Sequence, residues 1–464
     1  MALADLESDT VEAFRGQLRG TVLQPGDDGY EEARTVWNAM IDKEPALIVR
    51  CRGAADVIAG VNFARDLGLH LAVKGGGHNV AGNALCDDGL VLDLSPMDGV
   101  RVDPEAHTAQ VQGGAVMADL DHETQAHGLA VTGGIISSTG VAGLTLGGGW
   151  GRLGRKYGLA IDNLRAADVV TADGELVHAS EDENPELFWA LRGGGGNFGV
   201  VTSLEFDLHP VGPELPGGVL AYPASAFEPV IEFYREYAAE VPDAASCYSA
   251  FLPAPPEPPF PEAYWGEPML LFRLLYAGPM AEAEEVFEPF RSVGEPLINR
   301  METMPYVEYQ RISDELFPAG RRYYWKSNYF DGIPDGLVSA LADHARGLPT
   351  PYSSIFIEHL GGAINRVEPD ATAYPHRHPL FAITVSPAWT DADDDEVMIE
   401  WARTAYADLA EYASDGVYVN VLSNEGEARV REAYGEHFER LRRIKREWDP
   451  DNRFSVNQNI APAD

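Results

Sequence analysis

Apolar residues recur at helical spacing in residues 54–67, which predicts an amphipathic helix with one buried face. The apolar run 69–73 predicts a short strand that leads into the sequence GGGH. In a Rossmann unit such a glycine turn opens a helix, but here a second strand is predicted at 89–95, after a polar stretch. The context therefore excludes a Rossmann nucleotide site.

Further helices and strands are predicted in the same half of the chain. Residues 115–127 have helical periodicity, and 169–177 have the pattern of a hairpin with a polar turn in its middle. Residues 184–191 predict a helix for which Asn184 is placed as N-cap. The alternating run 200–208 predicts a half-buried strand.

A composition change near residue 213 separates this half from one that is rich in strand candidates. Between 217 and about 391, long apolar and aromatic runs predict a mostly antiparallel sheet. These runs are GVLAYP, CYSAFLPA, MLLFRLLYAG, RRYYWKSNYF, SSIFIEHL and LFAITVSPAW. The proline-rich segment 253–268 cannot pair as a central strand, so we expect a surface loop there.

Two helices are predicted near the end of the chain. The first follows the acidic residues 393–396 and has an apolar stripe formed by Val397, Trp401, Ala405 and Leu409. The second is predicted over 425–447, with a similar stripe. A tail rich in Asn and Gln follows at 449–462, and its composition indicates more than a frayed terminus.

Charge narrows the possible partners. The chain carries 73 acidic and 34 basic residues, a formal net charge of −39, and only five of the basic residues are lysines. Such a surface repels nucleic acid and anionic membranes, and its self-repulsion destabilises a compact fold unless counterions screen it. We therefore expect a halophilic protein of a salt-rich cytoplasm, with a merely acidic protein as the alternative.

Length and cysteine content set further bounds. The 464 residues predict two domains. Cys51, Cys86 and Cys247 have no spacing typical of a metal or redox site, and their odd number argues against a disulfide framework, so buried thiols are expected. The sequence has no N-terminal signal pattern and no apolar run of about twenty residues, so we expect a cytoplasmic protein that spans no membrane.

Glycine gathers in three clusters, at 75–77, 147–149 and 193–196. Glycine costs conformational entropy and contributes no side chain, so such clusters indicate backbone amides exposed to a ligand. A pyrophosphate would satisfy these amides without many cations. An acidic protein can therefore bind a cofactor that carries a pyrophosphate.

Four separated motifs give the sequence a specific resemblance: KGGGHN at 74–79, TGVAGLTLGGGWGRLGRKYGLAIDN at 139–163, RGGGGNFGVVTSLEF at 192–206 and DPDNRFSVNQNI at 449–460. In this order they resemble the FAD-linked oxidoreductases of the berberine bridge enzyme-like group, which share the vanillyl-alcohol oxidase (PCMH-type) flavin domain. The resemblance implies an α+β fold. A PCMH-type FAD-binding domain of two subdomains would occupy residues 1–212, with its core at about 42–211. Residues 213–412 would form a substrate domain, a large antiparallel sheet backed by helices, and residues 413–464 would return to the FAD domain.

The resemblance also implies the FAD-binding residues. It places the cofactor against Lys74, Gly75, Gly76, Gly77, His78, Asn79, Ser138, Thr139, Gly140, Gly143, Gly147, Gly148, Val201, Asn457, Gln458 and Asn459. His78 is the expected site of a covalent bond to the flavin 8α methyl group, the alternative being a histidine satisfied by local hydrogen bonds. Plant members attach the flavin a second time through a cysteine, but Ile136 stands at that position, so a single attachment is expected.

The reaction implied is oxidation of a CH–OH group of a small molecule, with hydride transfer to flavin N5 and a base that takes the hydroxyl proton. In this family a tyrosine of a Tyr-x-Asn-Tyr strand often serves as base; here YVNV supplies Tyr418 and Asn420, with Val421 in place of the second tyrosine. The resemblance therefore implies Tyr418 as the base, the alternative being a packed strand residue with its hydroxyl satisfied. Lys326 and the pair His376 and Arg377 are candidates for substrate contacts, or for ion pairs within the sheet.

The substrate stays open between a sugar and an aromatic compound, because the cap aromatics fit either one. These aromatics are Tyr323, Tyr324, Trp325, Tyr329, Phe356 and Trp389. Two rival functions also stay open: a flavin-binding module without catalysis, and an NADPH-dependent reductase of the PCMH superfamily. The sequence does not determine the oligomeric state.

Overall fold

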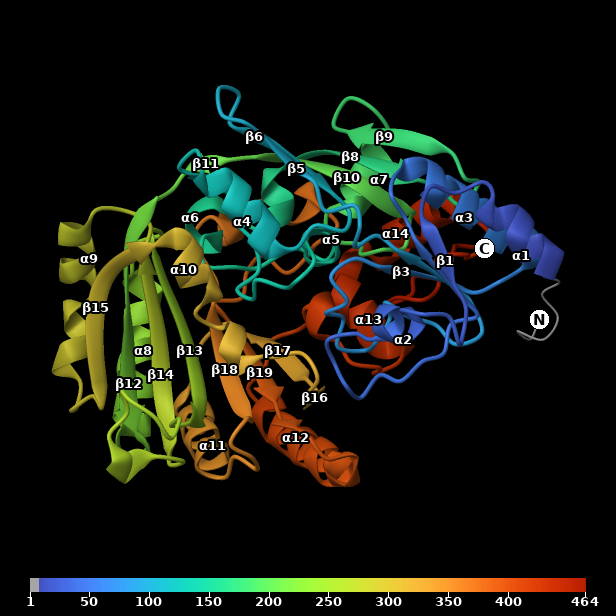
Figure 1. The fold of residues 1–464 in the computed structure, drawn as a ribbon. Coiled ribbons are helices and arrows are strands. Elements are labelled where there is room, and N and C mark those ends of the chain that lie inside the picture. The colour runs from blue at the N-terminus through green and yellow to red at the C-terminus, as the bar shows by residue number, and fades with distance from the viewer. Residues whose placement is uncertain (1–7) are drawn as a thin grey trace.

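The computed structural model describes residues 8–464, and its elements mix helices and strands along the whole chain (Figure 1). The helix predicted over 54–67 is present as α3 (Ala54–Leu67). It ends at Gly68, whose φ of 64° is left-handed and favours glycine. The predicted α+β fold class is confirmed.

The N-terminal sheet has four strands in the order β1-β2-β4-β3, with β2 and β3 both parallel to the central β4. Its strands are β1 (Thr21–Leu23), β2 (Leu47–Arg50), β3 (Leu71–Lys74) and β4 (Leu90–Asp93). Helices α1 (Ser8–Arg15) and α2 (Tyr30–Arg34) precede β2, and α3 packs on the sheet. The turn after β3 carries the GGGH sequence to the edge of this layer.

A five-stranded antiparallel sheet follows, in the order β5-β6-β10-β8-β9. Its strands are β5 (Val100–Asp103), β6 (Thr108–Gln112), β8 (Leu164–Val170), β9 (Leu176–Ser180) and β10 (Val200–Asp207). The predicted hairpin is β8 and β9, and the predicted alternating strand is β10. A two-stranded sheet of β7 (Leu129–Ala130) and β11 (His209–Pro210) lies beside it.

Short helices connect these strands: α4 (Met117–Gln125), α5 (Val141–Leu146), α6 (Gly154–Tyr157) and α7 (Pro185–Leu191). Asn184 is the N-cap residue of α7, as predicted, but within residues 8–464 its side chain makes no capping hydrogen bond. Asn184 has a left-handed φ of 50°, and its Nδ2 donates to the carbonyl of His178 at 2.7 Å. The side chain stabilises the preceding turn instead.

The second half forms a seven-stranded antiparallel sheet, called the cap sheet here, in the order β15-β12-β14-β13-β18-β19-β17. Its strands are β12 (Glu214–Pro223), β13 (Ala245–Pro253), β14 (Pro268–Tyr276), β15 (Ile298–Pro305), β17 (Lys326–Phe330), β18 (Ser354–His359) and β19 (Phe381–Ser386). Strand β15 was not predicted. The proline-rich segment joins β13 to β14 as a loop, as expected.

Helices cover one face of the cap sheet and share a hydrophobic core with it (Figure 1). They are α8 (Phe227–Glu240), α9 (Met280–Phe287), α11 (Asp335–Arg346) and α12 (Asp395–Ala410). Helix α10 (Tyr306–Arg311) leads back toward the first half, where it contacts α4. The long strand predicted at 321–330 is divided into β17 and a short β16 (Arg322–Tyr323), which pairs with β20 (Ala388–Trp389). The other face of the cap sheet is left for the site.

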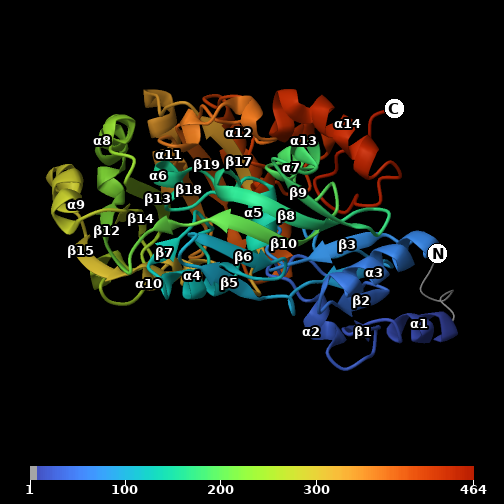
Figure 2. The same ribbon diagram turned by 90° about the horizontal axis from the view of Figure 1, so that it is seen from above.

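The C-terminal segment lies against the first half of the chain (Figure 2). The single helix predicted over 425–447 is two helices, α13 (Glu427–Tyr434) and α14 (Phe438–Trp448), because Gly435 adopts a φ of 48° between them. In α12 the predicted stripe is shifted, since Val397 is 63% exposed and Met398 is buried. The domain boundaries predicted after residues 212 and 412 stay predictions.

All three cysteines are buried free thiols, as expected. Within residues 8–464, no helix combines the length and the apolar character that crossing a bilayer requires.

Candidate flavin site

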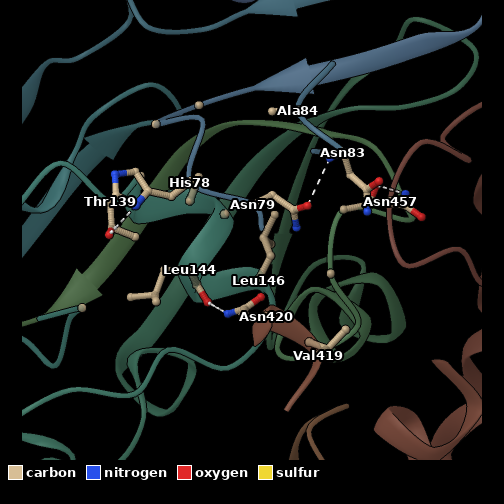
Figure 3. Close-up of a pocket in the computed structure, with 18 of the residues that line it drawn as sticks. His78, Asn79, Asn83, Ala84, Thr139, Leu144, Leu146, Val419, Asn420 and Asn457 are labelled. Carbon is tan, nitrogen blue, oxygen red and sulfur yellow. Dashed lines mark hydrogen bonds between the residues drawn. The ribbon is translucent and has the colours of Figure 1, made fainter. Parts of the chain in front are cut away.

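A cavity of about 370 Å³ lies between the first half of the chain and the cap sheet, within the size range of cofactor and ligand sites. Its walls come from the turn after β3, the loop and helix at 134–146, the glycine-rich loop 195–201, the C-terminal tail and the cap sheet. Figure 3 shows His78 and Thr139 on one side of this cavity and Asn457 on the other. Segments that are distant in sequence therefore build one site.

The two glycine turns pack backbone against backbone. A Cβ atom on Gly76 would lie 2.3 Å from the amide nitrogen of Gly140, so only glycine fits there. In residues 8–464, no backbone carbonyl accepts a hydrogen bond from the amides of Gly76, Gly77, His78, Ser138 or Gly140. Amides left unpaired in adjacent turns form a place for an anion.

His78 is held at the cavity wall on two edges and one face. Its Nε2 lies 2.8 Å from Ser138 Oγ, and its Nδ1 lies 3.5 Å from Thr139 Oγ1. The Trp37 ring stacks on the imidazole with 5.1 Å between centroids. Burial lowers the pKa of His78 to about 4, an effect that the charge of Asp314 offsets in part. The imidazole is therefore neutral at pH 7.

The opposite wall is fixed by a buried ion pair. Lys445 Nζ donates to Asp449 Oδ2 at 2.6 Å, to the Asn197 carbonyl at 2.7 Å and to the Phe454 carbonyl at 2.9 Å. Asn457 Nδ2 in turn donates to the Gly196 carbonyl at 3.1 Å. The tail and the glycine-rich loop are thus tied together where both line the cavity.

Tyr418 lies in the cavity wall with its hydroxyl already bonded. The hydroxyl accepts from the Gly149 amide at 2.9 Å and from Asn420 Nδ2 at 2.8 Å, and the ring stacks on Trp150 at 3.8 Å. Burial raises the pKa of Tyr418 above its ordinary value, with smaller opposing effects from these hydrogen bonds. Residues 419–421 form a 3-10 turn, not the strand that the resemblance implied.

The cap sheet contributes a carboxyl group that the sequence analysis missed. Along β18, Ile355 and Ile357 pack in the helix-covered core, whereas Phe356 and Glu358 line the cavity, as alternation in a strand requires. Glu358 Oε2 is buried and has no hydrogen-bond partner in residues 8–464. Burial raises the pKa of Glu358 to about 8. Tyr248, from the adjacent β13, lines the same region.

Twelve of the predicted site residues line the cavity. They are Gly75, Gly76, Gly77, His78, Asn79, Thr139, Gly140, Gly143, Val201, Tyr418, Asn457 and Gln458. Five others lie outside its lining: Lys74, Ser138, Gly147, Gly148 and Asn459.

Three of these five have contacts within the protein. Lys74 Nζ donates to the carbonyl of Ala33 at 2.7 Å, and Ser138 bonds His78. A Cβ atom on Gly147 would lie 2.1 Å from Asn420 Oδ1, so this glycine makes room for the protein's own side chain.

The candidates for substrate contacts, Lys326, His376 and Arg377, are not part of the cavity lining. Lys326 pairs with Glu425, and Arg377 is fully buried with both terminal nitrogens 2.8 Å from Asp162. His376 Nε2 contacts the Ala433 carbonyl at 2.9 Å. Of the predicted cap aromatics, only Trp325 and Phe356 are in the lining, where Phe317 joins them.

The residues of the cavity fit FAD. Free amides at the paired glycine turns suit a pyrophosphate, and the buried Asn457 Oδ1 at the cavity wall accepts no hydrogen bond in residues 8–464. A Cβ atom on Gly143 would meet nothing within 4 Å, so its side of the cavity is open to a ligand. The fold and the site together define a flavoprotein.

Comparison with known proteins identifies the family. The "FAD binding domain" family matches residues 45–180, and "Berberine and berberine like" matches residues 417–461. The chain is 31% identical to an FAD-linked oxidoreductase of Dictyostelium discoideum over 457 residues, with 97% of each protein covered. It therefore belongs to the FAD-linked oxidoreductases of the berberine bridge enzyme-like group, and it is an oxidoreductase.

Two relatives have named activities. The chain is 32% identical to (R)-6-hydroxynicotine oxidase of Paenarthrobacter nicotinovorans, covering 96% of this chain and 97% of that protein. The crystal structure of 6-hydroxy-D-nicotine oxidase from Arthrobacter nicotinovorans superimposes with a TM-score of 0.87 over 96% of this chain and 98% of that chain, at 31% identity. The chain is 28% identical to a xylooligosaccharide oxidase of Thermothelomyces thermophilus, covering 92% of this chain and 89% of that protein.

Proposed function

We propose that the enzyme is an FAD-dependent oxidase or dehydrogenase that removes a hydride from a CH–OH group of a sugar or an aromatic alcohol. FAD, when bound, supplies the hydride acceptor at its N5 atom. The observation that carries the proposal is the position of Glu358. This carboxyl group has a buried oxygen with no hydrogen-bond partner among residues 8–464, and it lines the same cavity as the amide-bearing glycine turns.

A proton acceptor is needed as the C–H bond breaks, because the hydroxyl proton must leave. Glu358 suits this role, since a raised pKa of about 8 makes its carboxylate a stronger base than an exposed one. Tyr418, the base predicted from sequence, already accepts two hydrogen bonds and has a raised pKa. We therefore propose that Glu358 accepts the hydroxyl proton of the substrate and that Tyr418 has a positioning role.

The shape of the substrate is set by aromatic walls. Phe317, Trp325 and Phe356 line the cap side, and the Phe317 and Phe356 rings lie 5.0 Å apart. Such walls enclose an aromatic ring or stack on a sugar face. Because named relatives oxidise hydroxynicotine and xylooligosaccharides, both classes belong in the substrate panel, together with aromatic amines.

We further propose that FAD is attached covalently and once, through His78. The neutral, unprotonated imidazole at the cavity wall supports this assignment. Ile136 also lines the cavity and offers no nucleophile for a second bond. Acid precipitation tests the bond: flavin is expected in the pellet for the wild type and in the supernatant for His78→Ala. Flavin in the supernatant of the wild type would disprove covalent attachment.

Anaerobic mixing with a panel of sugars, aromatic alcohols and aromatic amines tests the proposed reaction. Bleaching of the flavin absorbance by a sugar or an aromatic alcohol, lost in Glu358→Gln, is the expected result. Bleaching by aromatic amines alone would overturn the assignment to a CH–OH group. Bleaching by dithionite but by no member of the panel would favour a flavin-binding module without catalysis. Bleaching by NADPH alone would favour the reductase.

A further inference from the structure

The imidazole of His78 is oriented by contacts on three sides. Ser138 Oγ lies 2.8 Å from Nε2, while Thr139 Oγ1 is at 3.5 Å from Nδ1. Thr139 lines the cavity and Ser138 does not. The Nδ1 edge of the ring is therefore the one beside the cavity, and the Nε2 edge is turned to a hydroxyl outside it.

The ring face is also held. Trp37 stacks on His78 with an interplanar angle of 18°, and its own indole is fixed by Tyr323, stacked at 3.9 Å. Trp37 Nε1 donates to the Phe317 carbonyl at 2.8 Å. A ring that is bonded at one edge and covered on one face cannot rotate to exchange its two nitrogens without losing these contacts.

We propose that Ser138 is the positioning residue for covalent attachment of FAD, because its hydroxyl holds Nε2 and leaves Nδ1 as the nitrogen that bonds the 8α carbon. The inference rests on the proposed function, in that it requires FAD in this cavity and a bond at His78. A histidine in the tautomer with hydrogen on Nε2 has its free electron pair on Nδ1. In that tautomer Nε2–H donates to Ser138 Oγ, and the 2.8 Å contact keeps the Nε2 edge turned away from the cavity.

Covalent attachment forms one N–C bond and releases two protons and two electrons. The Nδ1 electron pair forms the N–C bond to the 8α carbon, that carbon loses one proton, and the imidazole loses the proton on Nε2. Two electrons pass to the flavin ring system, which is thereby reduced. Dioxygen then takes these two electrons with two protons and leaves as hydrogen peroxide. Ser138 is exposed, so the Nε2 proton has a path to solvent through its hydroxyl.

The experiment follows the attachment of added FAD to the full-length chain. Apoprotein of each variant is mixed with FAD in air; binding is measured by quenching of flavin fluorescence, and attachment by flavin that stays with the protein after acid denaturation. Ser138→Ala is expected to bind FAD within about twofold of the wild-type Kd, but to attach it at least about tenfold more slowly. Ser138→Thr, which keeps the hydroxyl, is expected to restore attachment.

Ser137→Ala is the matched control. It removes the neighbouring hydroxyl, which bonds Asp314 and not His78, so attachment at the wild-type rate is expected. After proteolysis, NMR of the flavin peptide is expected to show the bond at Nδ1.

Three results would overturn the proposal: attachment by Ser138→Ala at the wild-type rate, a bond at Nε2, or a Ser138→Ala variant that no longer binds FAD. A wild type that binds FAD but never attaches it would overturn this inference and leave the proposed oxidation standing. A wild type that binds no FAD would overturn both.

Discussion

Lys445 Nζ and Asp449 Oδ2 lie 2.6 Å apart in the interior, and neither side chain is exposed to solvent. All three ammonium protons have acceptors, and both carboxylate oxygens accept backbone amides. Burial lowers the pKa of Lys445, and the Asp449 carboxylate offsets part of this effect. The pair holds the tail and the loop that form one cavity wall.

Lys445→Met is expected to destabilise the fold by about 3–5 kcal/mol, because it leaves the Asp449 carboxylate buried without its partner. FAD retention should fall with it. Chemical denaturation and flavin stoichiometry are the measurements. Arg300→Met is the control, since it breaks an exposed pair with Glu302 and should cost at most about 1 kcal/mol. Equal effects of the two variants would contradict a special role for the buried pair.

Glu358→Gln is expected to slow flavin reduction by substrate at least about 100-fold, within the range that general bases contribute. The wild-type rate should rise with pH through about 8, because only the deprotonated carboxyl accepts a proton. Stopped-flow reduction between pH 6 and 9.5 measures both effects. If Glu358→Gln keeps the wild-type pH profile of flavin reduction and Tyr418→Phe loses the activity, Tyr418 is the base instead.

The same carboxyl group should affect stability. Its folded pKa is raised from the ordinary 4.5 to about 8, so between these pH values the unfolded chain ionises while the folded one does not. Stability is therefore lost as pH rises from 4.5 to 8. Glu358→Gln should gain on the order of 2 kcal/mol over the wild type at pH 8 and nearly nothing at pH 4.5. Thermal melts of apoprotein at both pH values provide the comparison.

Salt should stabilise the protein. We propose that a formal charge of −39 reflects work in a salt-rich cytoplasm, and we expect the melting temperature to rise by several degrees between low and molar KCl. Melting temperatures measured in a neutral osmolyte at the same osmolality separate the screening of charge by KCl from the effect of crowding. A melting temperature that is flat or falling with KCl would reject the halophilic proposal.

Helices and strands were predicted correctly from the sequence where the spacing of apolar residues matches the local backbone structure. Helix α3 has helical periodicity and a glycine at its C-cap, and β10 alternates between buried and half-buried positions. The helix over 425–447 was predicted as one because its apolar stripe continues, but the left-handed Gly435 interrupts it. Strand β15 lies at the sheet edge with most of its residues exposed or half-buried, so no alternation marks it.

Site residues near the glycine motifs were predictable, since the turn geometry itself requires glycine there. Glu358 was not, because its orientation depends on the register of β18 against β13, in which Ser249 lies opposite Ile357 and Ala250 opposite Phe356. One signal was available: in SSIFIEHL, Phe356 and Glu358 share the face opposite Ile355 and Ile357. The sequence of β18 alone does not tell which of these two faces lines the cavity. The helices cover the face of Ile355 and Ile357, and this leaves Phe356 and Glu358 to face the cavity.

We propose that the amide-bearing turns of residues 75–79 and 138–140 hold FAD beneath the cap sheet. The most direct test is the absorbance spectrum of protein purified, or refolded with FAD, in molar KCl. We predict a flavin spectrum at one FAD per chain, lost when Gly76→Val forces the two turns apart, since a Cβ atom there meets the Gly140 amide. Wild-type protein that is folded but retains no FAD would contradict the account.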